Sequence, residues 1–113
     1  KQPYPTPEAM MIAEVNQTIQ EFRTCAEMAV EAGFDGVEVH GAHGYLPNQF
    51  LLPSRNERTD DFGGSLENRL RFLKEVLREC ILAIGADKVS LRISPFSYAD
   101  VDDEEQELIT TYR

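Results

Sequence analysis

The 113-residue sequence has no tryptophan and only two cysteines and two histidines. None of its apolar runs approaches the roughly 20 residues that a membrane span requires. Neither Cys25 nor Cys80 has a CxxC partner, and both fall in helical patterns, so each is interpreted as a small buried apolar residue and not as half of a disulfide. The N-terminal stretch lacks the apolar segment of a signal peptide, which leads us to expect a soluble, cytoplasmic protein.

Basic residues are scarce: 11 Lys and Arg face 20 Asp and Glu, for a formal net charge of −9. Polyanions would be repelled, so we expect no nucleic-acid partner and no anionic membrane surface as a partner. Much of the charge lies in residues 100–107, which we interpret as a solvated face or a helix start. The 42% of apolar residues is enough for a core, and the length suits one domain.

Two amphipathic helices are predicted. The first runs from about Pro7 to Ala32, with Thr6 as N-cap and Gly33 as the left-handed stop. The second is capped by Ser65 and ends at Gly85. Apolar residues recur at steps of three and four along both. The predicted stripes are Ile12, Val15, Ile19, Phe22, Ala26 and Ala29 in the first, and Leu66, Leu70, Leu73, Val76, Leu77, Cys80, Ile81 and Ile84 in the second.

Two short segments, residues 34–40 and 88–94, alternate as strands do. One face of each is apolar (Val37 and Val39; Val89, Leu91 and Ile93). The opposite face is small or polar (Gly36, Glu38 and His40; Ser90, Arg92 and Ser94). A long connection over residues 41–64 carries a short helical turn around residues 47–52. Residues 96–113 are expected to form a loop and then an acidic helix start.

Helices that alternate with strands indicate a parallel sheet. Strands with one apolar and one polar face suit a (β/α)8 barrel, in which we expect the apolar face to pack on the outer helices. Active sites in such barrels form at the C-terminal ends of the strands. His40 and Arg92 lie at those ends. A barrel needs eight strands and roughly 250 residues. Residues 1–113 are therefore expected to form a partial barrel domain of about two βα units, which belongs to a longer chain or associates to cover its sheet edges.

The two histidines, His40 and His43, lie three residues apart in a Gly-rich turn. A histidine that ends a strand is often only structural, and HxxH spacing also occurs in metal sites. No third Cys or His lies near this motif in the sequence, however, so a metal site is not expected. Arg92 could be an ion-pair partner of Glu38, which has the same parity.

An ordered series of motifs strengthens the functional interpretation. The series is His40-Gly-Ala-His43-Gly-Tyr45, Asn48-Gln-Phe-Leu, Asn56-Glu-Arg-Thr-Asp60 and Gly63-Gly-Ser-Leu-Glu-Asn-Arg69. In this series the sequence strongly resembles the Old Yellow Enzyme family of FMN-dependent NAD(P)H oxidoreductases, also called ene-reductases. The resemblance implies a (β/α)8 barrel, of which this chain looks like the fourth and fifth strands.

The resemblance also implies roles. His40 and His43 would bind the substrate's carbonyl or nitro oxygen, Tyr45 would bind substrate and donate a proton, and Arg92 would contact FMN. NADPH or NADH would be the reductant and an electron-poor alkene the substrate. Arg58 and Asp60 are expected to hold the long loop together, and Gly63-Gly64 to form a turn.

Two alternatives remain open. One is an FMN/iron–sulfur reductase of dienoyl thioesters or amines from the same superfamily, whose cluster cysteines would fall beyond residue 113. The other is a non-catalytic barrel fragment that is stable through self-association, as a homo-oligomer, or through contact with the remainder of a barrel.

Overall fold

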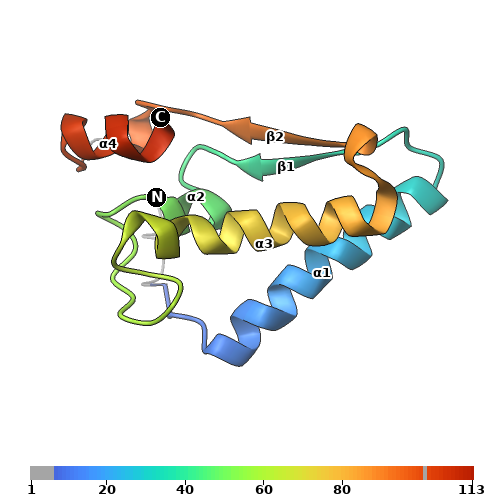
Figure 1. Ribbon diagram of the computed structural model, residues 1–113, viewed down its shortest axis with the longest axis horizontal. Coiled ribbons are helices and arrows are strands. Elements are labelled where there is room, and N and C mark those ends of the chain that lie inside the picture. Colours follow the sequence, from blue (N-terminus) through green and yellow to red (C-terminus); the bar gives the residue numbers. More distant parts are fainter. Residues whose placement is uncertain (1–6, 101) are drawn as a thin grey trace, which may run out of the picture.

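The computed structural model describes residues 7–100 and 102–113 and alternates helices with two strands (Figure 1). The elements in chain order are α1 (Ile12–Glu31), β1 (Val37–Gly41), α2 (Leu46–Leu51), α3 (Leu66–Ile84), the 3-10 turn η1 (Ala86–Lys88), β2 (Val89–Ile93), the 3-10 turn η2 (Tyr98–Asp100) and α4 (Glu105–Tyr112). Within these residues no helix has the length and apolar character needed to cross a membrane.

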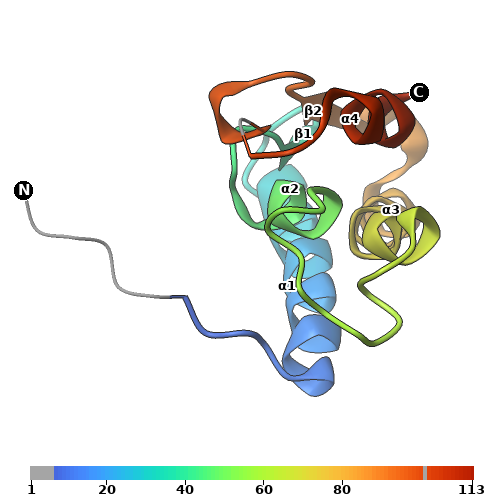
Figure 2. The same cartoon turned by 90° about the vertical axis from the view of Figure 1, so that its left-hand side faces the viewer.

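Strands β1 and β2 pair in parallel, as predicted, with Val39 opposite Leu91 and His40 opposite Arg92. Helices α1 and α3 lie on one face of this sheet, and α2 and α4 lie together at the end where the strands finish (Figure 2). Parallel pairing places the C-terminal ends of both strands at the same edge. The predicted parallel α/β arrangement is therefore confirmed.

Helix α1 begins at Ile12, so the predicted start at Pro7 is wrong. The carbonyl of Met10 accepts a hydrogen bond from Arg58 Nη1 at 2.8 Å in place of a helical N–H. The Glu14 carboxylate accepts from the Met11 N–H at 2.6 Å and caps the first turn. Thr6, the predicted cap, lies outside the described residues.

The other predicted helix ends are confirmed. Ser65 Oγ accepts from the Asn68 N–H at 3.3 Å at the start of α3. Gly33 follows α1 with φ +97°, and Gly85 follows α3 with φ +94°. Both angles lie in the left-handed region that glycine adopts without a steric cost.

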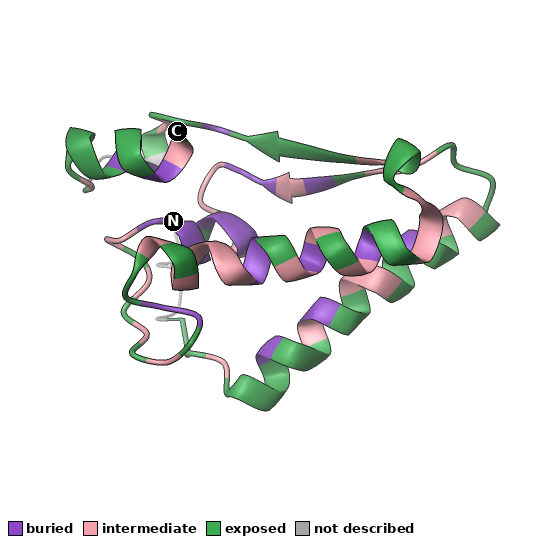
Figure 3. Cartoon of the chain, in the orientation of Figure 1, coloured by how far each residue is buried: buried purple, intermediate pink, exposed green. Residues whose placement is uncertain are grey.

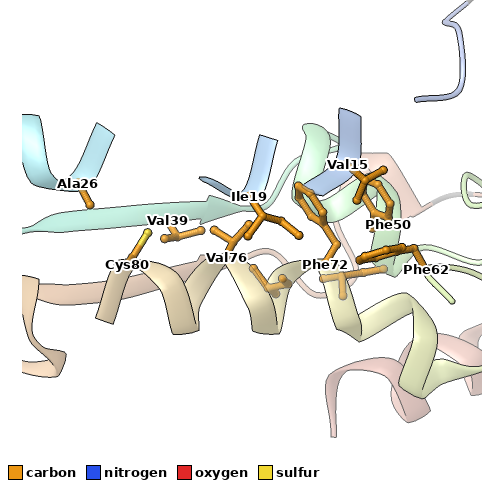
Figure 4. Packing of buried hydrophobic residues seen from close by; sticks show 11 residues of the cluster. Val15, Ile19, Ala26, Val39, Phe50, Phe62, Phe72, Val76 and Cys80 are labelled. Atoms are coloured by element: carbon orange, nitrogen blue, oxygen red, sulfur yellow. The ribbon is translucent and has the colours of Figure 1, made fainter. Parts of the chain in front are cut away.

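The main core lies between α1, α3, α2 and β1 (Figure 4). Its buried members are Val15, Ile19, Ala26, Val39, Phe50, Leu51, Phe62, Phe72, Leu73, Val76 and Cys80. Phe72, absent from the predicted stripe, stacks on Phe50 at 4.2 Å between ring centroids. Ile81 was expected on the buried side but is 39% exposed. Cys25 is exposed, contrary to prediction, because its neighbour Ala26 takes the interior position.

The apolar face of β2 is poorly covered, although we expected it to pack on outer helices. Leu91 is 38% exposed and Ile93 is 45% exposed. Most of β2 is accordingly coloured as exposed in Figure 3. The helix that follows β2, α4, packs its Leu108 and Tyr112 on Leu52 at the strand end and not beneath β2. Strand β1 begins at Val37, and Phe34 is exposed outside it.

The acidic segment is only partly the solvated surface that was expected. The Asp103 carboxylate accepts from the N–H and the hydroxyl of Ser54, at 2.7 and 2.8 Å. Asp102 pairs with Arg55 at 2.7 Å. Asp100 is buried, and its Oδ2 accepts from the Ser97 N–H. The Asp102 and Asp103 contacts connect the start of α4 to the loop after α2. The predicted helix near the C-terminus is confirmed as α4.

Candidate functional site

An open concavity of about 540 Å³ lies beyond the ends of the strands, lined by His40, His43, Tyr45 and Tyr98. His40 comes from β1, and its ring centroid lies 5.8 Å from that of His43 and 5.4 Å from that of Tyr45. The three residues that the sequence singled out for substrate therefore gather around one hollow. Tyr45 is 63% exposed, so its phenol is accessible to a ligand.

The loop between β1 and α2 has an unusual backbone. His43 has φ +58° and Gly44 has φ +79°. A left-handed conformation is unfavourable for histidine, so outside contacts must hold it. The His43 N–H donates to Ser94 Oγ at 2.8 Å, and the His43 carbonyl accepts from Tyr98 Oη at 3.2 Å. The Gly44 N–H donates to Asn48 Oδ1, and the Gly44 carbonyl accepts from Gln49 Nε2, both at 2.7 Å.

Tyr98 belongs to this site, and sequence reasoning missed it. Its ring lies parallel to that of His43, with 6.0 Å between centroids and 1° between planes. Nothing periodic in the sequence signals this, because Tyr98 follows Pro95 in an irregular segment. Ser94 could have been identified as a site residue from the sequence, because it lies on the same polar face of the second strand as Arg92.

Arg92 pairs with Glu38 at 2.6 Å, so the ion pair considered from the sequence is present. Its side chain is 56% exposed, and that of Glu38 is 45% exposed. Among the described residues, Nη1 and Nη2 of Arg92 have no hydrogen-bond acceptor. These N–H groups lie on the same strand face as His40, because the two residues are register partners. The guanidinium therefore retains donors for a ligand that binds beside the histidines.

The ring of His43 also has a nitrogen without a hydrogen-bond partner among the described residues. Within residues 7–100 and 102–113, its buried Nδ1 has no hydrogen-bond partner. Buried polar atoms are normally paired, so an unpaired ring nitrogen is typical of a place where a ligand or water completes the bonding. The exposed Arg92 guanidinium fits a site that binds a polar planar group such as a flavin, whereas His43 lines the concavity with His40 and Tyr45.

The long loop is held as predicted. Arg58 donates to both carboxylate oxygens of Asp60, from Nε at 3.1 Å and from Nη2 at 2.7 Å. This contact holds the pKa of Asp60 below its usual value, with help from the Phe62 N–H, while burial opposes the shift. Gly63 lies against the Arg58 carbonyl, where a Cβ would not fit. In the part of the chain described, no three His, Cys, Asp or Glu side chains group as metal ligands would.

Fold and site thus define a parallel α/β unit with a histidine- and tyrosine-lined mouth at its strand ends. The sequence matches the family described as NADH:flavin oxidoreductase / NADH oxidase over residues 1–113, and the chain belongs to that family.

Curated relatives support this assignment. A probable flavin mononucleotide-dependent alkene reductase of Leishmania infantum is 54% identical over 112 residues, which cover 98% of this chain and 31% of the relative. The 12-oxophytodienoate reductase 7 of Oryza sativa subsp. japonica is 53% identical over 92 residues, covering 81% of this chain and 23% of the relative. The chain thus spans less than a third of these relatives.

Solved structures agree. Old Yellow Enzyme from Pichia sp. superposes with a TM-score of 0.87 at 43% identity, over 93% of this chain and 28% of that one. Morphinone reductase in complex with tetrahydroNAD gives a TM-score of 0.86 at 41% identity, over 95% of this chain and 30% of that one. The described structure is therefore an α/β part of the Old Yellow Enzyme fold.

Proposed function

We propose that the protein takes part in an FMN-dependent NAD(P)H oxidoreductase that reduces activated C=C bonds of α,β-unsaturated carbonyl-type substrates. The observation that carries this proposal is the convergence of His40, His43 and Tyr45 on one concavity at the strand ends. The names of the relatives, an alkene reductase and a 12-oxophytodienoate reductase, support the substrate class.

Each residue has a distinct task in this chemistry. Imidazole N–H groups of His40 and His43 donate to the substrate's carbonyl oxygen, where negative charge develops, so they stabilise the transition state more than the substrate. The Tyr45 phenol delivers a proton to the α-carbon of the substrate. Tyr98 forms a wall of the same concavity.

FMN would lie beside Arg92, whose free N–H groups would donate to the polar edge of its ring, and when reduced by NADH or NADPH it would supply the hydride. The pairing of Arg92 with Glu38 orients the guanidinium on the polar face of the sheet. We place β1 and β2 as the fourth and fifth strands of the barrel. The remaining strands would contribute the other flavin contacts, and a helix from the rest of the barrel would cover the exposed apolar face of β2.

The names of the relatives favour this reaction over the FMN/iron–sulfur alternative. The exposed Leu91 and Ile93 favour association of this unit with further barrel strands or a second copy, in line with the fragment alternative. A non-catalytic unit that only associates would not support flavin reduction and reoxidation. An absorbance measurement therefore distinguishes this alternative from the proposed reaction.

The test is made on the protein loaded with FMN under anaerobic conditions. NADPH or NADH should bleach the yellow flavin absorbance, and an enone should then restore it. The saturated ketone with the same carbon skeleton is the matched control and should restore nothing. Tyr45→Phe should slow restoration by the enone roughly tenfold or more, because the proton donor is lost. Failure of the enone to restore colour faster than the saturated ketone contradicts the proposal.

A further inference from the structure

The buried side chain of Asn48 joins the site loop to the C-terminal helix. Asn48 is 0% exposed in the first turn of α2. Its Oδ1 accepts from the Gly44 N–H at 2.7 Å, and its Nδ2 donates to Tyr112 Oη at 3.0 Å. Tyr112 is the last residue of α4 and lies 64 positions after Asn48. Through Asn48, α4 is therefore linked to Gly44, the residue between His43 and Tyr45.

The chemistry of the partners fixes the orientation of this amide. The Gly44 N–H can only donate, so the Asn48 carbonyl oxygen must face it. The amide NH2 is then turned toward Tyr112 and needs an acceptor there. The phenol oxygen provides one while remaining protonated, since burial raises the pKa of Tyr112; the Asn48 hydrogen bond opposes this shift, and the nearby Asp100 and Asp103 add to it. Without this oxygen the amide would keep a buried, unpaired donor.

The loop depends on such contacts because of its backbone. A left-handed non-glycine residue such as His43 costs about 1–2 kcal/mol, and here it adjoins a second left-handed residue, Gly44. Side chains from β2's end, η2 and α2 hold the two peptides. Among these side chains, Asn48 is itself hydrogen-bonded to Tyr112 of α4, a helix that does not line the concavity.

We propose that Asn48 and Tyr112 are positioning residues, through which the docking of α4 sets the placement of His43 and Tyr45. Helix α4 is a firm support, because Leu108 packs on Leu52 and the Asp103 carboxylate takes two hydrogen bonds from Ser54. The catalytic consequence rests on the proposed function. The structural coupling between α4 and the loop does not depend on the proposed function, and it can be measured separately.

The structural test compares Tyr112→Phe with Thr111→Val. Thr111 is also buried on α4, but its hydroxyl donates to the Glu107 carbonyl of its own helix, so Thr111→Val removes a buried hydroxyl without touching Asn48. Glycine labelled with ¹⁵N gives seven backbone signals, one of them from Gly44, and the two histidines give one imidazole Cε1–H signal each. Both variants are compared with the unmodified chain at equal temperature and pH.

We expect hydrogen exchange of the Gly44 amide to become about tenfold faster or more in Tyr112→Phe, a loss of about 1.4 kcal/mol of protection. The His43 signal should shift, and His40, on β1, should shift less. Thr111→Val should leave Gly44 and His43 unchanged. Equal Gly44 exchange in the two variants would overturn the proposal, as would a Tyr112→Phe chain in which all glycine signals collapse together, because the bond would then serve stability alone.

The kinetic test uses the FMN-loaded protein. Tyr112→Phe should slow enone-dependent return of flavin colour about tenfold while bleaching by NADPH changes less than about twofold, since a small misplacement of donor groups is costly to the step they serve. If Gly44 and His43 respond as expected but no enone reaction exists in any variant, the proposed function fails and the coupling stands. If the enone reaction exists and Tyr112→Phe slows it no more than Thr111→Val, the positioning role fails alone.

Discussion

Strands β1 and β2 pair residue for residue and alternate alike, yet their surroundings differ. Val39 on β1 is 4% exposed, while its register partner Leu91 on β2 is 38% exposed. Residues of α1, α3 and the short α2 pack on the apolar face of β1, whereas α4 does not cover the apolar face of β2, and most of β2 is coloured as exposed in Figure 3. Alternation therefore predicts which way a side chain points but not whether another element covers it.

The polar ends of the two strands differ in the same way. The loop after β1 donates hydrogen bonds to Ser94 and Asn48 and accepts hydrogen bonds from Tyr98 and Gln49. Arg92 on β2 pairs with Glu38, and both side chains are about half exposed. The substrate side of the proposed site is thus assembled within this chain, while the proposed flavin side has donors still free to bind.

The largest expected effect lies in the core beneath β1. Phe72→Ala should lower the free energy of unfolding by about 3–5 kcal/mol, because it removes a fully buried ring that stacks on Phe50. Leu82→Ala, on the same helix at a 60% exposed position, should cost less than about 1 kcal/mol. Urea denaturation measures both, and similar losses would show that the core is not where the structure places it.

The strand comparison is sharpened by truncating the register partners. Val39→Ala should cost about 2 kcal/mol, from lost burial and the cavity left behind. Leu91→Ala removes more atoms but should cost less than about 1 kcal/mol, since much of that side chain is already in water. A larger loss at Leu91 would mean that another copy or segment covers β2 in solution, which sedimentation at several concentrations would reveal.

The smallest effect concerns the loop that carries Arg58 and Asp60. Because Arg58 lowers the pKa of Asp60, the folded state holds that proton less tightly than the unfolded state. The contribution of the Arg58–Asp60 contact to the free energy of unfolding is therefore present above the ordinary Asp pKa of about 4 and is lost as the pH falls below that value. Asp60→Asn should cost about 1 kcal/mol at neutral pH, and the difference should shrink in acid. A difference that is constant with pH contradicts the assignment.

The fold was largely predictable where the signal is local. Ser65, Gly33 and Gly85 act through hydrogen bonds or backbone angles within a few residues, and the strand alternation depends on nearest neighbours. Contacts made through space were not predictable. The start of α1 is set by Arg58, 48 residues from Met10 along the chain, and this displaced the expected helix start.

The site shows the same division. His40, His43 and Tyr45 follow one another in a motif, so their proximity could be predicted. Tyr98 contacts the His43 carbonyl from an irregular segment 55 positions away, and Tyr112 contacts Asn48 of α2 from 64 positions away, so no local pattern indicates either contact. Cys25 was misplaced because a helical stripe fixes burial only to within one neighbouring position.

The most direct measurement concerns what the two imidazoles act on. In the FMN-loaded protein, stopped-flow absorbance would follow bleaching by NADPH and then recovery with an enone, for the unmodified chain and for the double replacement His40→Ala with His43→Ala. If the imidazoles stabilise charge on the substrate oxygen, recovery should slow about a hundredfold or more while bleaching changes less than about threefold. Equal slowing of both steps, or unchanged recovery, would contradict a substrate clamp at this site.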